Sequence, residues 1–357
     1  MADGLRRDMA HDDMAHDDTT RDDVSLTHDD ELDALVDRAD LDGLVRLIDA
    51  RCESRDWEGL VRVRTRCRAA TKTGRQVWPA ATLAEYRIAL LAPAESACSV
   101  LGEDGGRFTI GPLTEVIAQH HTWAELAPFL EHGPRRSFVA HERVLRGDVP
   151  NIDDDALDLP LTLLDWEPAY VVPVYGDEGV ESPCPSDSWR HDWKVVDAAA
   201  SATCIDDADV SSALRSLVEP WTSSSNGRAE SVAVEGDASH ALRALGLTTA
   251  RLTGIEARDA LAWLAWCGAS GGAHGRRRGG ALGRFGTWWL LAALGGIADD
   301  WNDLVGEGEL GDEIGAVSES LLWFRFDDAT TTGYELSLIA VDPIDGLSFG
   351  LLARDSA

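Results

Sequence analysis

Three consecutive arginines, Arg276 to Arg278, lie in a glycine-rich segment of an otherwise acidic chain. The segment from Gly268 to Gly280 reads Gly-Ala-Ser-Gly-Gly-Ala-His-Gly-Arg-Arg-Arg-Gly-Gly and is called the Gly/Arg loop below. No Asp or Glu occurs between Ala260 and Ala298, although the whole chain has 63 acidic residues against 32 Lys and Arg. The absence of carboxylates around three arginines in an acidic chain indicates that the Gly/Arg loop is either buried or binds an anion.

The residue types of the Gly/Arg loop suit the binding of a phosphate or carboxylate group. Glycines allow a backbone to approach a ligand and to direct several N–H groups at it, and guanidinium groups are planar donors for such anions. A histidine adds an acid, a base or a metal ligand. The loop matches neither the P-loop nor the dinucleotide fingerprint, since it lacks Gly-Lys-Ser/Thr and no strand is expected directly before it. The candidate anion-binding residues of the loop are Gly271, Gly272, His274, Arg276, Arg277 and Arg278.

A structural role for the same loop is the competing interpretation. Small residues allow close packing of the two apolar helices that the loop joins, and its arginines would cap the carbonyl end of the first helix. They would also pair with the acidic residues that follow the second helix, such as Asp299 and Asp300. The sequence leaves both interpretations open.

A second candidate group lies in the segment Ser225-Asn-Gly-Arg-Ala-Glu230, directly before an expected strand. Asn-Gly is a turn signal, and Arg228 with Glu230 is alternatively a surface pair. As a hypothesis, Asn226, Arg228 and Glu235 face the Gly/Arg loop across one cleft. Asn226 and Arg228 therefore join the candidate ligand-binding residues.

Composition limits the classes of function. The formal net charge of -31 argues against general nucleic-acid binding, which needs a basic surface. The longest apolar run is well short of the roughly 20 residues that cross a bilayer, and the acidic N-terminal stretch favours a cytoplasmic protein. The six cysteines include no C-x-x-C pair, which predicts free thiols. We expect no metal site, no cofactor, no nucleic acid and no membrane among the partners.

The chain divides into four segments by composition. Residues 1–30 form an Asp-rich and His-rich tail that is expected to be disordered. Residues 31–147 have Leu and Val at helical spacing, and the string Asp40 to Leu47 recurs in altered form at Asp56 to Val63, which predicts a helical module with Asp residues at helix starts. Residues 148–224 are acidic and Pro-rich, and predict an extended connector. Residues 225–357 are expected to form an α+β domain.

The α+β expectation rests on the order of the C-terminal elements. Strands are expected at 232–236 and 250–255, and helices at 240–245, 256–269 and 282–297. Three further apolar stretches, at 321–326, 334–341 and 347–352, are separated by turn-forming residues and predict a closing antiparallel meander. The fold class is therefore α+β, with an all-helical, repeat-like module before a C-terminal α+β domain that ends in the meander.

Several strings resemble a family of uncharacterised proteins of unknown function from GC-rich actinobacteria. The strings are Arg55 to Leu60, Gly111 to Glu115 with His121 to Leu126, Ala140 to Gly147, Ser225 to Glu230, and Trp263 to Gly279. The resemblance covers about Leu32 to the C-terminus and leaves out the tail. It implies a bacterial, cytoplasmic setting, and brings no activity, cofactor or catalytic residue.

Three functions follow from these patterns. The preferred one is a ligand-binding or protein-interaction protein whose Gly/Arg loop contacts a small anion, with a protein partner at the helical module as a further candidate. The second is an enzyme on a phosphorylated or carboxylated small molecule, with His274 transferring a proton and Arg276 to Arg278 stabilising charge. The third is a helical scaffold in which the Gly/Arg loop only caps helices.

Overall fold

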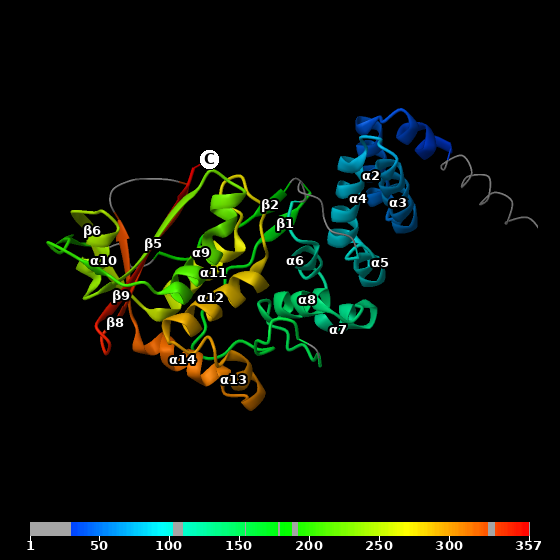
Figure 1. Ribbon diagram of the computed structural model, residues 1–357. Helices are drawn as coiled ribbons and strands as arrows, with labels where there is room; N and C mark the ends of the chain where they lie inside the picture. The colour runs from blue at the N-terminus through cyan, green and yellow to red at the C-terminus, as the bar shows by residue number, and fades with distance from the viewer. Residues whose placement is uncertain are drawn as a thin grey trace, which may run out of the picture. The chain divides into compact units, whose positions relative to one another are not determined.

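The computed structural model describes residues 30–102, 110–153, 155–177, 179–187, 192–327 and 333–356. Except for Asp30, the acidic tail expected at 1–30 lies outside these residues. The chain forms two compact units, Met1–Glu85 and Tyr86–Ala357, which are described separately. The second contains every candidate site residue from the sequence (Figure 1).

The first unit is helical and confirms the two predicted Asp caps. Residues 30–37 are helical and precede α2 (Leu41–Ser54) and α3 (Trp57–Lys72), and α4 (Trp78–Leu91) begins in this unit. The Asp40 and Asp56 side chains accept hydrogen bonds from the backbone N–H groups of Gly43 and Gly59 at 2.9 and 2.8 Å. Each bond satisfies a backbone donor that the first turn of a helix leaves free.

Short helices open the second unit. They are α5 (Ala94–Ser99), α6 (Leu113–Ile117), α7 (Trp123–Leu126), the 3₁₀ helix η1 (Ala127–Phe129) and α8 (Pro134–Val144). Thr122 and Glu125 form a reciprocal capping box at the start of α7. After α8 the chain is largely irregular, with a two-stranded hairpin of β1 (Val174–Gly176) and β2 (Gly179–Glu181).

The extended interpretation of residues 148–224 is wrong for its last part, where α9 (Ala208–Ser223) forms. Pro220 lies inside this helix and has no N–H to donate to the carbonyl of Ser216, four residues earlier. Arg278 replaces the missing donor, because its Nη1 donates to that carbonyl oxygen at 3.1 Å. A bond from a distant segment therefore helps to accommodate the proline that the sequence analysis treated as a helix breaker.

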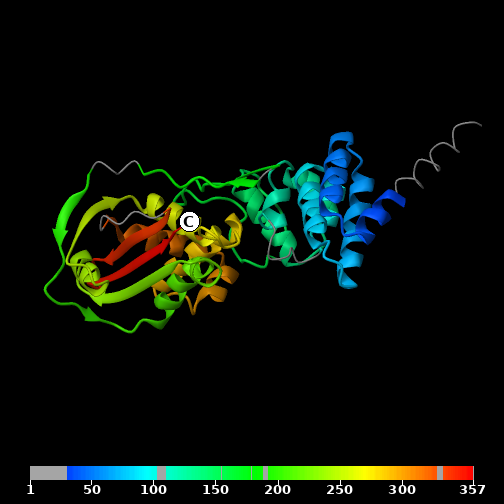
Figure 2. The same ribbon diagram turned by 90° about the horizontal axis from the view of Figure 1, so that it is seen from above.

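A seven-stranded antiparallel sheet forms the centre of the second unit. Its strands lie in the order β3 (Lys194–Asp197), β6 (Thr249–Ile255), β7 (Leu322–Asp327), β8 (Tyr334–Asp342), β9 (Leu347–Asp355), β5 (Arg228–Glu235) and β4 (Thr203–Cys204). The predicted meander is confirmed as β7, β8 and β9, which lie side by side at the red end of the chain (Figure 2). The α+β class is confirmed as well.

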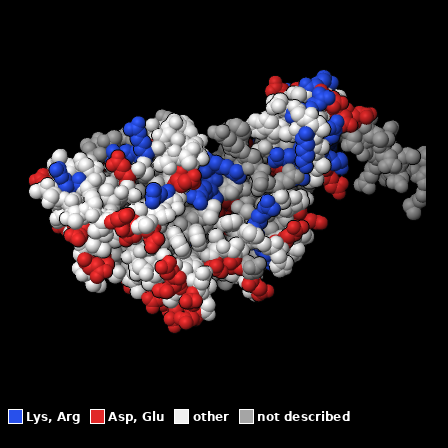
Figure 3. Space-filling model, in the orientation of Figure 1, with Lys and Arg blue, Asp and Glu red and all other residues white. Residues whose placement is uncertain are grey.

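The two faces of the sheet carry different helices (Figure 1). On one face, α9, α11 (Ala257–Ala269) and α12 (Gly280–Leu294) enclose a core that includes Trp221, Trp288 and Leu351. On the other face, α10 (Ala238–Ala244) packs through Leu242 against strand residues such as Ile339. The last two helices, α13 (Trp301–Glu307) and α14 (Leu310–Ser320), follow α12, and acidic side chains gather over them (Figure 3). Their exposed acids include Asp303, Glu307, Asp312 and Glu313.

Helices α11 and α12 pack closely because small residues lie where the two helices meet. A Cβ atom at Gly283 would lie 2.2 Å from the backbone oxygen of Ala265, and one at Gly268 would lie 3.4 Å from the Cα of Gly283. The glycines thus bring the two helix backbones nearly into contact. Among the described residues, no helix combines the length and the apolar character needed to cross a membrane.

Candidate functional site

The Gly/Arg loop doubles back on itself between α11 and α12. The backbone N–H of Arg278 donates to the carbonyl of Ala269 at 2.8 Å, so the loop closes at its base. A Cβ atom at Gly271 would lie 2.3 Å from the carbonyl oxygen of Gly275, and one at Gly275 would lie 2.1 Å from that of Gly271. Gly272 has a φ of +69°, a conformation that L side chains rarely adopt. The glycines that the sequence analysis selected as ligand contacts therefore allow the loop backbone to turn tightly and to contact itself.

Arg277 is buried and forms an ion pair with Glu115 of α6. Its Nε and Nη2 donate to the two carboxylate oxygens at 2.7 and 2.8 Å, and its Nη1 donates to the Ser182 hydroxyl at 2.9 Å. Burial alone would raise the pKa of Glu115, but the charge and hydrogen bonds of Arg277 hold that pKa below its usual value. The central arginine of the three thus has a carboxylate partner already, at a position that the sequence analysis did not consider.

Two glutamates receive the first backbone N–H groups of α12. Gly280 N donates to Glu115 Oε1 at 2.9 Å, and Ala281 N donates to Glu142 Oε1 at 2.8 Å. The other Glu142 oxygen accepts from Arg146 Nη1 at 3.0 Å. Burial and the nearby charge of Glu115 raise the pKa of Glu142 to about 7. Carboxylates at a helix N-terminus are favourable, so α6 and α8 fix the start of α12.

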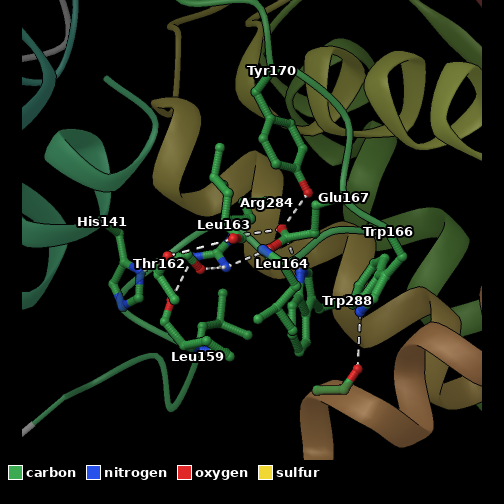
Figure 4. Close-up of polar contacts among 12 residues, drawn as sticks. His141, Leu159, Thr162, Leu163, Leu164, Trp166, Glu167, Tyr170, Arg284 and Trp288 are labelled. Atoms are coloured by element: carbon green, nitrogen blue, oxygen red, sulfur yellow. Dashed lines mark hydrogen bonds and ion pairs between the residues drawn. The ribbon is translucent and has the colours of Figure 1, made fainter. Parts of the chain in front are cut away.

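A second buried ion pair, Arg284 with Glu167, fixes the next turn of α12 (Figure 4). Both side chains are fully buried, and two guanidinium nitrogens donate to the carboxylate at 2.7 Å each. Tyr170 and Trp288 point at the same carboxylate and donate to it at 2.7 and 3.0 Å. Burial would raise the pKa of Glu167, but the hydrogen bonds and charge of Arg284 keep it low.

This buried cluster extends to His141 of α8. Arg284 Nη1 lies 3.3 Å from His141 Nδ1, and His141 Nε2 lies 2.8 Å from Asp155 Oδ2. Arg284 also donates to the carbonyls of Pro160 and Thr162 at 2.9 and 3.0 Å. Because every one of these groups is bonded within the protein, the cluster orders the irregular chain around residues 155–167 against α12. It is an internal anchor.

A hollow at one end of the sheet gathers polar residues, and it is called the polar pocket below. Its volume is about 430 Å³, and its lining consists of Asn226, Arg228, Glu230, Leu352, Arg354, Asp355 and Ser356. Asn226 and Arg228, which the sequence analysis selected, lie in it together. Glu235 does not, because it lies at the opposite end of β5 and pairs with Leu347.

Strand register places the charges of the polar pocket. Arg228 of β5 lies directly opposite Arg354 of β9, and Glu230 lies opposite Leu352. Arg354 is also opposite Glu335 of β8, with 3.6 Å between their charged atoms. Arg228 is exposed and forms no ion pair within the described residues. Like charges opposite one another on adjacent strands are unfavourable. Arg228 is therefore a cation that has no oppositely charged partner among the described residues.

Asp355 joins the polar pocket to the Gly/Arg loop. Its Oδ2 accepts from Ala273 N at 2.6 Å, and a Cβ at Gly272 would lie 2.3 Å from the same oxygen. The Asp355 residue is 2% exposed, and its Oδ1 has no hydrogen-bond partner among the described residues. Close by, His274 N donates to the Ser225 hydroxyl at 2.9 Å. The structure thus brings the loop backbone against the 225–228 segment.

The candidate residues from the sequence accordingly separate into two groups. Gly272 and His274 lie where the loop contacts Asp355 and Ser225, and Asp355 lines the polar pocket with Asn226 and Arg228, whereas Gly271 packs against Gly275 and Arg276 within the loop. Arg277 points to Glu115, and Arg278 points to Ser216 of α9. Arg276 is exposed. The three neighbouring arginines therefore do not converge on one anion.

Three charged residues of the polar pocket, Glu230, Arg354 and Asp355, were not selected from the sequence. Glu230 follows Arg228 by two positions, and the alternation of a strand would have placed it on the same face. Arg354 and Asp355 come from the pairing of β5 with β9, which leaves no local signal in either segment. Among the described residues, no group of three or more His, Cys, Asp or Glu side chains is placed to hold a metal ion.

A family model described as a family of unknown function, DUF6183, matches residues 42–356. The chain belongs to this family. The predicted membership in a family of unknown function is confirmed, while the actinobacterial source stays a prediction. None of the curated proteins and none of the solved structures matches the chain.

Proposed function

We propose that this member of the family binds a small polar organic molecule in the polar pocket, with an anionic group of the ligand at Arg228. The observation that carries the proposal is the register of Arg228 against Arg354 at the wall of a pocket. A phosphate or carboxylate next to Arg228 would relieve the repulsion between the two guanidinium groups and would form charge-assisted hydrogen bonds. The proposal retains the small-anion contact that was predicted for the Gly/Arg loop, but places the anion at residues 226–228 instead of at the three arginines of the loop.

The other residues of the pocket favour a ligand with donor groups as well. Asn226 offers both an amide donor and an amide acceptor, and Glu230 offers a carboxylate on the same strand face as Arg228. A ligand with one acidic group and at least one N–H or O–H group would complement both charges. Amino acids and sugar phosphates are two classes with this pattern, and a volume of about 430 Å³ accommodates either.

The Gly/Arg loop has a supporting role in this proposal. Asp355 fixes the loop backbone at Ala273, and the Arg277–Glu115 pair fixes the base of the loop to α6. The bond from Ala273 would hold Asp355, a lining residue of the polar pocket, in place, which lowers the cost of ordering the site when a ligand binds. Proton transfer by His274 with the three arginines is not part of the proposal.

The cysteines agree with a reducing compartment, the setting that we propose. Cys52, Cys67, Cys98, Cys184, Cys204 and Cys267 form no disulfide. Burial raises the pKa of Cys267, which keeps this thiol protonated. A protonated thiol is a poor nucleophile, so we give Cys267 a packing role.

A thermal-shift screen tests the proposed function. The probes are inorganic phosphate, acetate, L-glutamate and glucose 6-phosphate, each added to the wild type and to Arg228→Gln and Asn226→Ala. A ligand that binds only the folded state raises the melting temperature, so at least one probe should stabilise the wild type. Either substitution should weaken that effect.

Arg215→Gln is the matched control, because Arg215 is exposed on α9 and lies outside the polar pocket. It should respond to the probes as the wild type does. The proposal fails if no probe stabilises the wild type, or if Arg228→Gln and Arg215→Gln respond alike.

A further inference from the structure

A second hollow, called the apolar cavity below, lies between α9 and α12 and is separate from the polar pocket. Its volume is about 300 Å³. The lining combines large apolar side chains with small residues and one arginine, namely Ala213, Ser216, Leu217, Gly268, Arg278, Leu282, Phe285, Gly286 and Trp289. It shares no lining residue with the polar pocket. A volume of this size is at the lower end of the range for small-molecule sites.

Glycines on two helices allow the Leu217 side chain to pack directly against the backbones of α11 and α12 at the cavity. A Cβ atom at Gly286 would lie 2.9 Å from Leu217 Cδ2, and one at Gly268 would lie 2.8 Å from the same atom. Phe285 and Trp289 of α12 also line the cavity; they are half-buried and stack nearly parallel, with ring centroids 6.4 Å apart and an interplanar angle of 14°. The cavity therefore has an apolar, partly aromatic wall that a flat or branched apolar group would cover.

Arg278 supplies a positive charge at this cavity. Its Nη1 donates to the Ser216 carbonyl, which Pro220 leaves without a helical donor. A guanidinium has five N–H donors, so this bond occupies only part of its capacity. In the described part of the chain Arg278 forms no ion pair, whereas Arg277 and Arg284 each have a buried carboxylate. An uncompensated guanidinium beside an apolar wall favours a ligand that carries an anion on an apolar body.

We infer that the apolar cavity is a binding site for an amphipathic organic acid, with its carboxylate at Arg278 and its aromatic or branched body against Leu282, Phe285 and Trp289. Burial of the apolar body would supply most of the affinity, at roughly 25 cal/mol per Å². The carboxylate would add charge-assisted hydrogen bonds and would discriminate acids from neutral analogues. This inference does not depend on the polar pocket, since none of the residues that line the apolar cavity lines the polar pocket.

A charge test uses phenylacetate and its neutral analogue phenylacetamide, with binding measured by isothermal titration calorimetry. Phenylacetate should bind the wild type more tightly than phenylacetamide does. Arg278→Gln removes the charge and should weaken the binding of phenylacetate by about tenfold or more. The affinity for phenylacetamide should change little.

Arg215→Gln is the matched control for charge, because Arg215 also donates to a backbone carbonyl of α9, that of Ser211 at 2.9 Å, but does not line the apolar cavity. It should bind phenylacetate as the wild type does. Arg228→Gln should also leave phenylacetate binding unchanged, which separates this site from the polar pocket.

A steric test uses the position of Ser216 at the cavity. Ser216 is exposed, so Ser216→Phe should place its ring over the cavity without disturbing the core, and should abolish the binding of both probes. Ser212→Phe is the matched control, one turn earlier on α9 at an exposed position that does not line the cavity. Circular dichroism and the melting temperature check that both variants fold.

The inference is overturned if neither probe binds the wild type. It is also overturned if Arg278→Gln and Arg215→Gln bind phenylacetate equally, or if the folded Ser216→Phe variant binds both probes as Ser212→Phe does. Equal binding of phenylacetate and phenylacetamide to the wild type would contradict the role of Arg278.

Discussion

Arg277 and Glu115 form a two-bond ion pair between segments 162 residues apart in the sequence. The pair ties the Gly/Arg loop to α6, and the same carboxylate accepts the first N–H of α12 from Gly280. Both side chains are buried. The absence of acids around the three arginines therefore has a structural explanation at Arg277, because its counter-charge comes from another part of the chain.

Removing the Glu115 charge should destabilise the protein strongly. Glu115→Gln leaves the buried Arg277 guanidinium without its ion-pair partner, and breaking such a pair lowers the free energy of unfolding by about 3–5 kcal/mol. Urea denaturation at neutral pH measures the change. Glu319→Gln, at an exposed position of α14, should change stability by less than about 0.5 kcal/mol.

The double variant Glu115→Leu with Arg277→Met is a further check on this pair. Replacing both charges with apolar groups avoids an unpaired ion, so the double variant should lose less stability than the two single substitutions together. Strict additivity of the two single effects would contradict the ion pair as the source of the destabilisation.

The elements of the fold were largely predictable because they depend on local patterns. Alternating apolar residues and turn residues identified β8 and β9, and the Asp caps marked the starts of α2 and α3. One exception is α9, since a proline within 148–224 indicated an extended chain; α13 and α14 are others, because no helix was expected at 298–320. The free carbonyl of α9 is satisfied by Arg278, from a segment that lies more than 50 residues later.

The candidate site was predictable only in part, for a related reason. Asn226 and Arg228 were selected from a turn signal and a charge next to a strand, which are local features. Arg354 and Asp355 reach the same pocket through strand pairing, and no spacing in the sequence encodes which strands are neighbours. The partner of Arg277 was hidden in the same way, since Glu115 lies in a short helix far from the loop.

Stability should decrease as pH rises from about 4.5 to about 7 because of Glu142. Burial and the neighbouring Glu115 charge raise the pKa of Glu142 from 4.5 to about 7 in the folded protein. The folded state therefore retains a proton that the unfolded state releases in this pH range. For such a pKa shift, proton linkage lowers the free energy of unfolding by about 3 kcal/mol between about pH 4.5 and about pH 7. The pKa of Glu115 is lowered, so its own effect appears only as pH falls below about 4.5.

Glu142→Gln tests this pH dependence, because a neutral amide resembles the protonated acid. Charged groups around it, Glu115, Arg146 and Arg277, remain in the variant. Urea denaturation of both proteins from about pH 5 to about pH 8 gives the difference in stability. The variant should gain stability relative to the wild type as pH rises. Parallel pH profiles would rule out Glu142 as the titrating group.

Gly283→Ala should destabilise the contact between α11 and α12, although alanine is the better helix former. The added Cβ would lie 2.2 Å from the backbone oxygen of Ala265 and 2.9 Å from the Ala269 Cβ, so one helix must move. Overpacking of this kind costs about 1–3 kcal/mol. Gly306→Ala on α13 is the control, because nothing lies within 4 Å of its added Cβ. This substitution should raise the free energy of unfolding by up to about 1 kcal/mol. Thermal and urea denaturation measure both variants. If the two substitutions shift stability in the same direction, close approach of α11 and α12 at Gly283 is not what requires the glycine.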